Sequence, residues 1–150
     1  MDDDDDAVYA REPEPGDVVR ICRALNEAQA RYLLVGGDLL VEDSPDNVRR
    51  VKAGLAVLPD NAAADVDDED VRQHTVVRVA DEVVVDLMGR ACGVSYDEAA
   101  RDAETLERDG VAIPVASPRT LIRLKQTARP QDALDRAFLE GVLRSRGESV

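Results

Sequence analysis

The sequence predicts an α/β (α+β) fold, a small mixed β-sheet flanked by helices, in one domain. Segments with apolar residues at helical spacing alternate along the chain with short runs of β-branched residues. Turn residues separate two pairs of these short runs, which is typical of hairpins. The 150 residues are 44% hydrophobic, which is enough for one packed core of this kind.

The N-terminal half contains two predicted helices with two predicted strands between them. Asp17 is a suitable N-cap for the first helix, in which apolar residues recur every three or four positions. Gly36 and Gly37 separate the two apolar runs that predict the strands. Ser44 and the proline after it form the pattern of an N-cap followed by proline in the first helical turn. In chain order these elements cover residues 17–30, 32–35, 38–42 and 45–57.

The C-terminal half contains two predicted hairpins and three predicted helices. The acidic segment 59–70 precedes them and is expected to form a loop or a short irregular helix. Ser95 and Glu98 form a capping-box pattern, which predicts a short helix. Asp109 and Gly110 are a strong turn signal for the second hairpin. The paired strands cover 75–79 with 83–88 and 105–108 with 111–116, and the helices begin at Ser95, Ser117 and Pro130.

Charge is unevenly distributed along this acidic chain, which carries 32 acidic and 19 basic residues for a net charge of −13. Residues 1–16 begin with a run of aspartates, and we expect an acidic disordered tail there, followed by a domain over 17–146. The acidic start is the opposite of a signal peptide, and no apolar run approaches the ~20 residues of a membrane helix. We therefore expect a cytoplasmic protein with neither a membrane nor double-stranded DNA as a partner.

Asp86 is the most unusual residue of the predicted strands, because it interrupts a run that is otherwise apolar. A carboxylate in a buried strand is costly unless it is paired, hydrogen-bonded or bound to a cation. Two interpretations stay open. Asp86 is either the ion-pair partner of a nearby arginine such as Arg90, or a metal ligand or general base.

Asp38 presents the same choice at the start of the second predicted strand. Gly-Gly-Asp is ordinary turn chemistry, so a structural role is the simpler interpretation. Glu42 lies on the same face of that strand but ~13 Å away at ~3.3 Å per residue, which is too far to share one ion. A second carboxylate beside Asp38 must therefore come from another strand, and Asp86 is the best candidate.

The remaining reactive side chains give weaker signals. His74 precedes a strand without a cysteine or histidine companion and is expected at the surface. Cys22 is expected in the core, and neither it nor Cys92 has a histidine or a CxxC partner nearby in the sequence. We therefore expect no thiol nucleophile. The sequence also lacks the Walker, GxGxxG, HExxH and GxSxG motifs.

Several short segments, taken in order, carry a resemblance to a known family. Over about residues 17–140 the chain resembles the small stand-alone bacterial nucleotidyltransferases of the DNA-polymerase-beta-like superfamily, some of which act as toxins of toxin–antitoxin pairs. The segments that carry the resemblance are 25–27, 31–41, 44–47, 85–88, 93–99, 109–115, 121–125 and 129–135.

The resemblance implies a set of site residues. In the family, a glycine pair precedes a helix that holds the nucleotide phosphates, and three aspartates hold two divalent ions that clamp the triphosphate. By position, Gly36 and Gly37 match the glycine pair, as nucleotide-binding residues. Asp38 and Asp86 match the second and third aspartates, as catalytic residues and Mg²⁺ ligands. Lys125 matches a lysine that lies near phosphate.

Two features of the family have no counterpart, namely the first aspartate and the helix after the glycine pair, because Gly37 runs directly into Asp38. One expected function is Mg²⁺-dependent transfer of a nucleoside monophosphate from an NTP to an RNA or protein hydroxyl, by a toxin with a cognate antitoxin. The alternative is a catalytically degenerate module that binds a nucleotide or a partner protein. A third hypothesis is an acidic globular protein with neither function. With two carboxylates in place of three, we expect weak Mg²⁺–NTP binding and slow transfer.

Overall fold

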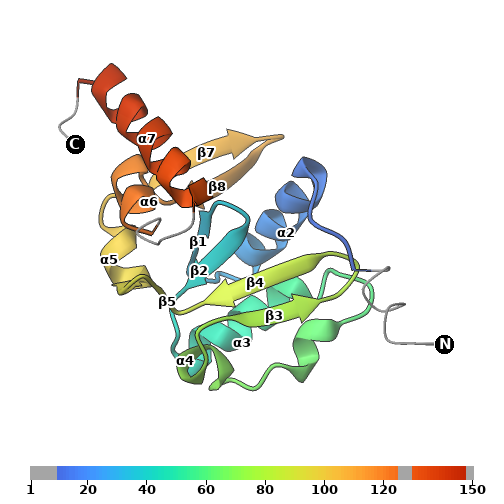
Figure 1. Cartoon of the computed structure of the whole chain (residues 1–150). Coiled ribbons are helices and arrows are strands. Elements are labelled where there is room, and N and C mark those ends of the chain that lie inside the picture. The colour runs from blue at the N-terminus through green and yellow to red at the C-terminus, as the bar shows by residue number, and fades with distance from the viewer. Residues whose placement is uncertain (1–9, 125–129, 148–150) are drawn as a thin grey trace.

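A six-stranded mixed sheet forms the centre of the computed structural model, which describes residues 10–124 and 130–147 (Figure 1). The strand order is β3-β4-β2-β1-β8-β7, and a separate two-stranded ribbon pairs β5 with β6. The strands are β1 (Tyr32–Val35), β2 (Asp38–Val41), β3 (Val77–Ala80), β4 (Val84–Met88), β5 (Arg90–Ala91), β6 (Val94–Ser95), β7 (Glu104–Arg108) and β8 (Val111–Val115). The predicted fold class is confirmed.

Helices cover both faces of the sheet and follow the predicted order. They are α2 (Pro15–Glu27), α3 (Pro45–Leu55), the 3₁₀ helix η1 (Ala62–Asp65), α4 (Asp70–Gln73), α5 (Tyr96–Ala100), α6 (Pro118–Leu124) and α7 (Pro130–Ser145). Of the helices in the described part of the chain, none combines the length and the apolar character that crossing a membrane requires.

The sheet has a buried aliphatic cluster on each face. On one face, Leu39 and Leu87 pack with Leu25 of α2 and Val51 of α3. On the other face, Leu40 packs with residues of α5 and α6. Successive side chains of a strand point to opposite faces, so a strand buried on both sides is apolar at nearly every position. An aspartate in such a strand therefore needs a specific partner.

The β1–β2 hairpin closes directly over the glycine pair. The strands are antiparallel and Val35 pairs with Asp38, so Gly36 and Gly37 form a two-residue turn. Gly36 has a φ of +64°, which glycine adopts without strain. The chain therefore passes from β1 to β2 without the helix that the resembling family has at this point.

The segment before α2 lies along the sheet. The Arg11 backbone N–H donates to the Glu82 carbonyl oxygen at 3.3 Å, and the Arg11 carbonyl accepts from the Val84 N–H at 2.8 Å. Arg11, which falls within the predicted tail, thus hydrogen-bonds to Val84 of β4 in the structure. The first nine residues lie outside the described part.

Asp17 was predicted to be the N-cap of α2, but in the structure it lies within the first turn of that helix. Glu14 is the N-cap, and Asp17 fills the third helical position, where its carboxylate accepts from the Glu14 backbone N–H at 2.9 Å. The Arg11 guanidinium also donates to Asp17 at 2.6 Å. These hydrogen bonds, that of Arg11 above all, lower the pKa of Asp17 to about 2. The helix therefore begins two residues earlier than predicted.

The acidic segment after α3 contains η1 and is anchored by a buried carboxylate. Asp81, which is 3% exposed, accepts hydrogen bonds from the backbone N–H groups of Asp60, Ala62 and Glu82 at 2.9, 2.8 and 2.7 Å. Burial by itself raises the pKa of Asp81. The hydrogen bonds from the three backbone N–H groups and the charge of Arg20 together lower the pKa by more than burial raises it, so the net shift is downward. This single side chain joins the β3–β4 turn to the segment before η1.

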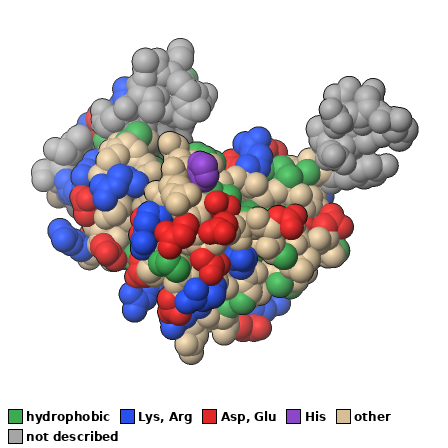
Figure 2. All heavy atoms as spheres, turned by 90° about the horizontal axis from the view of Figure 1, so that it is seen from below, with side chains coloured by type: hydrophobic (Ala, Val, Ile, Leu, Met, Phe, Trp, Pro, Cys, Tyr) green, Lys and Arg blue, Asp and Glu red, His purple; other side chains and the backbone are tan. Residues whose placement is uncertain are grey.

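Asp68, another acid of this region, is paired with bases of α3. Asp68 accepts from Arg49 at 3.0 Å and from Lys52 at 3.4 Å, both on α3. Figure 2 views the molecule from below Figure 1 and shows acidic and basic side chains intermingled on this face. This face therefore carries charges of both signs.

Gly54 allows α2 and α3 to approach closely. A Cβ atom there would lie 2.7 Å from Leu25 Cδ2 and 2.9 Å from Leu25 Cα. We expect Gly54→Ala to lower the free energy of unfolding by about 1–3 kcal/mol, despite the better helix propensity of alanine. Gly141 of α7 is the matched control, because no described atom lies within 4 Å of its Cβ position. Gly141→Ala should raise stability by roughly 0.5–1 kcal/mol. Urea denaturation measures both, and equal shifts would contradict the close approach.

Candidate functional site

β2 and β4 bring Asp38 and Asp86 together. Their parallel register pairs Leu39 with Leu87, so the two aspartates, one residue earlier on each strand, lie side by side. Leu39 and Leu87 both face α2 and α3, and the alternation of side chains turns both carboxylates to the opposite face. Neighbouring strands are ~4.8 Å apart, which is within the span of one small ligand. The roles of the two aspartates stay predictions.

Arg78 extends this pair to a row of three charged residues across β2, β4 and β3. Its Nε and Nη2 atoms donate to Oδ1 and Oδ2 of Asp86 at 2.9 and 3.0 Å. The Asp86 side chain is 17% exposed and that of Arg78 is 65% exposed. The pKa of Arg78 is raised first by the hydrogen bond to Asp86 and by its charge, and further by Glu12 and Asp38. Arg78 therefore lies in the field of both aspartates.

The ion-pair partner of Asp86 is thus Arg78 and not Arg90, which the sequence suggested as an example. The β3–β4 hairpin sets Arg78 directly opposite Asp86 in the antiparallel register. Arg90 lies beyond the end of β4 and donates to the Gly93 carbonyl oxygen at 3.1 Å. Sequence proximity favoured Arg90, but the pairing of strands decided the contact.

The row contains two carboxylates, whereas transfer through two metal ions needs three. Among residues 10–124 and 130–147, no group of three or more His, Cys, Asp or Glu side chains could hold a metal ion. Both oxygens of Asp86 also accept from Arg78. The donor set therefore does not fit two Mg²⁺ ions. Asp38 and Asp86 fit at most one, because Mg²⁺ needs few protein ligands and keeps several waters.

The glycine pair does not form the start of a phosphate-binding helix. Gly36 and Gly37 form a hairpin turn, and β2 follows at once. The backbone N–H groups of a helix N-terminus, which bind phosphate well, are not supplied at this point. Lys125, the other predicted phosphate contact, lies outside the described residues. Of the five predicted site residues, the structure brings together Asp38 and Asp86 on one face.

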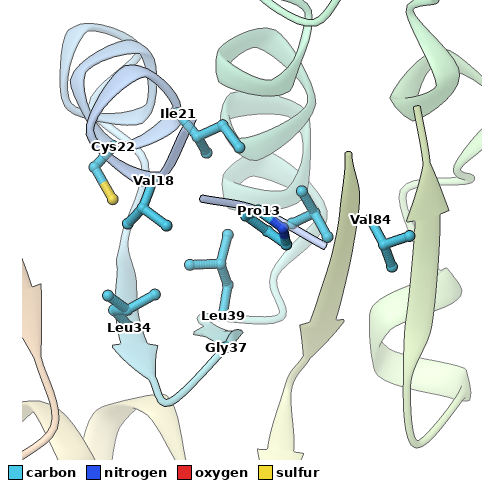
Figure 3. Close-up of a pocket in the computed structure, with 9 residues that line it drawn as sticks. Pro13, Val18, Ile21, Cys22, Leu34, Gly37, Leu39 and Val84 are labelled. Atoms are coloured by element: carbon cyan, nitrogen blue, oxygen red, sulfur yellow. The ribbon is translucent and has the colours of Figure 1, made fainter. Parts of the chain in front are cut away.

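A small apolar cavity lies beside this hairpin and has a volume of about 20 Å³ (Figure 3). Figure 3 shows Val18 of α2 above Leu34 and Leu39 of the sheet, with Gly37 at the edge. A volume of this size holds about one water, and an apolar lining gives that water no partners. Cys22 also lines the cavity, and burial raises the pKa of its thiol. We interpret the cavity as a packing gap.

A larger cleft of about 390 Å³ lies at the carboxyl ends of β2 and β4. Asp43 and Gly89, which follow those strands, line it together with α4, the two residues after α4 and the β5–β6 ribbon. His74 and Cys92 both line this cleft, although the sequence showed no histidine near either cysteine. Sequence spacing could not reveal that both residues line one cleft, because the lining comes from three separate segments of the chain, at Asp43, 71–75 and 89–93. The Cys92 thiol donates to the Leu124 carbonyl oxygen at 3.2 Å.

No protein-family model matches the chain, and no curated protein matches it. Membership of the nucleotidyltransferase superfamily therefore stays a prediction, and function must be inferred from the side chains that the fold brings together.

Proposed function

We propose that this chain is a nucleotidyltransferase-like module that binds one Mg²⁺–nucleoside triphosphate weakly at Asp38 and Asp86, with little or no nucleotide transfer. The observation that carries this proposal is the parallel register of β2 and β4, which sets the two carboxylates side by side on one face. In the resembling family, these two positions hold divalent ions. When bound, Mg²⁺ would neutralise phosphate charge and orient the triphosphate.

Two structural features favour weak binding of the nucleotide, and a third disfavours its transfer. Arg78 occupies both oxygens of Asp86, so a cation must compete with a bidentate guanidinium. The hairpin over Gly36 and Gly37 replaces the helix N-terminus that would hold phosphates. Within residues 10–124 and 130–147, the two carboxylates also leave no ligand set for the second ion that would activate an acceptor hydroxyl.

The transferase itself is the second candidate, because the same adjacency of Asp38 and Asp86 is what transfer to an RNA or protein hydroxyl would use. It would require a third acid. Glu42 and Asp43 are the nearest in sequence, but both lie at the far end of β2. Glu42 accepts from Arg31 at 2.6 Å and from Ser44. Neither supplies a carboxylate beside Asp38. Glu12 lies near enough to raise the pKa of Arg78, but among the described residues it forms no metal-holding group with the two aspartates, which supports the binding module.

Calorimetric titration with Mg²⁺–ATP and Mg²⁺–GTP tests the binding site. We expect Asp38→Ala and Asp86→Ala each to weaken binding at least tenfold, because each removes half of the ligand set. Asp46→Ala is the matched control, since Asp46 of α3 is an exposed acid that also pairs with arginines. The stability cost of Asp86→Ala should stay below ~1 kcal/mol, because Arg78 is largely exposed. A steep fall in melting temperature would make Asp86 a structural residue.

Incubation with labelled NTPs, Mg²⁺ and bulk tRNA tests transfer separately. We expect incorporation close to background. Robust incorporation that Asp86→Ala abolishes would establish the transferase, and binding unchanged by both alanine variants would remove Asp38 and Asp86 from the site.

A further inference from the structure

The larger cleft, which does not include Asp38 or Asp86, has the position and size of a ligand site. Its volume of about 390 Å³ falls within the ~300–1,000 Å³ that is usual for small-molecule sites. It lies at the carboxyl ends of the parallel strands β2 and β4, the edge where α/β sheets bind ligands. Asp38 lies five residues before Asp43, and Asp86 lies three residues before Gly89, so the two sites are separated by ~10–16 Å along the strands.

Most polar side chains on the cleft are hydrogen-bond donors. Arg72, His74 and Arg90 line it, and Asp43 is the acidic residue of the lining. Arg90 has no carboxylate within salt-bridge distance among the described residues, and the Gly93 carbonyl oxygen holds its guanidinium at 3.1 Å. A guanidinium that is positioned by a carbonyl keeps further N–H groups for a ligand.

Arg72 and His74 have only long contacts with acids. Arg72 Nη1 lies 3.6 Å from Glu69 Oε2, and His74 Nε2 lies 4.0 Å from Asp70 Oδ1. Both acids are on or next to α4 and neither lines the cleft. Two arginines against one aspartate therefore give the lining a net positive charge, in a chain whose net charge is −13.

Two features of the backbone shape the cleft, namely the close approach at Gly89 and the tight β5–β6 turn. A Cβ atom at Gly89 would lie 3.0 Å from Asp43 Cβ and 3.3 Å from Val71 Cγ1. The β5–β6 turn places Cys92 and Gly93 at φ values of 48° and 79°, which carries Arg90 to the rim. Cys92 thus stands in a backbone conformation that glycine or asparagine favours.

We propose that this cleft binds a phosphate-bearing small molecule, whose oxygens accept hydrogen bonds from Arg90 and Arg72. Arginine suits this ligand because its planar fork donates to two phosphate oxygens at once. No bond is made or broken, and Cys92 serves only as a neighbouring, exposed thiol.

Cys92 provides a direct readout of occupancy. It is exposed, whereas Cys22 is 1% exposed, so iodoacetamide should alkylate Cys92 selectively. Mass spectrometry follows this reaction with pyrophosphate as the probe and EDTA present, at constant ionic strength set with chloride. We expect pyrophosphate to slow alkylation at least fivefold in the unmodified chain. The same protection is expected in Asp86→Ala, which separates this cleft from the Mg²⁺–nucleotide site.

Substitution of the two arginines locates the binding. Arg90→Gln combined with Arg72→Gln should abolish the protection, while Arg23→Gln, an exposed arginine on α2, should preserve it. Both arginines of the cleft are exposed, and circular dichroism checks that the variants fold. Absence of protection in the unmodified chain at millimolar pyrophosphate would overturn the proposal. Protection that persists in the double variant would overturn it as well.

Discussion

Arg78→Gln is expected to raise the affinity of the Asp38–Asp86 pair for a divalent cation about fivefold. Arg78 donates to both carboxylate oxygens of Asp86, at 2.9 and 3.0 Å, so a cation that uses Asp86 must displace a bidentate guanidinium. A fivefold change corresponds to about 1 kcal/mol, which is the upper end for a partly exposed ion pair of good geometry. Calorimetric titration with Mn²⁺, and then with Mg²⁺–ATP, measures the gain.

Two further variants make this result specific. Arg49→Gln removes an arginine that also binds a single carboxylate on the surface, that of Asp68 at 3.0 Å, and should leave the cation affinity within about twofold. Asp86→Ala combined with Arg78→Gln should cancel the gain, because the released ligand is then absent. Weaker nucleotide binding in Arg78→Gln alone would show that Arg78 contacts phosphate and does not compete with the cation.

Asp81→Ala is expected to lower the free energy of unfolding by about 3 kcal/mol. The Asp81 carboxylate is 3% exposed and accepts from three backbone N–H groups, which would all lose their partner. Because folding lowers the pKa of Asp81, its stabilisation is present above the ordinary carboxyl pKa of about 4 and is lost as the pH falls below it. Urea denaturation at pH 7 and at low pH measures both effects.

Asp81→Asn and Asp65→Ala are the controls for this substitution. Asparagine keeps one acceptor oxygen, so about half of the loss is expected. Asp65 is an exposed acid of η1, and its replacement should change stability by less than ~0.5 kcal/mol. A cost below ~1 kcal/mol for Asp81→Ala would mean that water replaces the carboxylate without strain.

Local chemistry made most elements predictable. Ser44 caps α3 by accepting from the Asn47 N–H at 3.2 Å, and Ser95 caps α5 by accepting from the Glu98 N–H at 3.3 Å. Asp109 and its neighbouring glycine form the β7–β8 turn, with φ values of 52° and 80°. These signals act over a few residues, so they can be recognised without knowledge of the fold. The β5–β6 ribbon was missed because two-residue strands have no periodicity to detect.

The sequence by itself determined the fold class, the N-caps of α3 and α5, the turn residues and the fact that Asp38 and Asp86 interrupt apolar strands. Only the tertiary structure decided that these aspartates are neighbours, that Arg78 pairs with Asp86, and that Asp81 anchors a distant segment. Only the tertiary structure also showed that Arg72 and Arg90 line the same cleft. The physical reason is that strand order and register are set by packing the whole sheet between its helices, which brings together side chains that no local spacing relates.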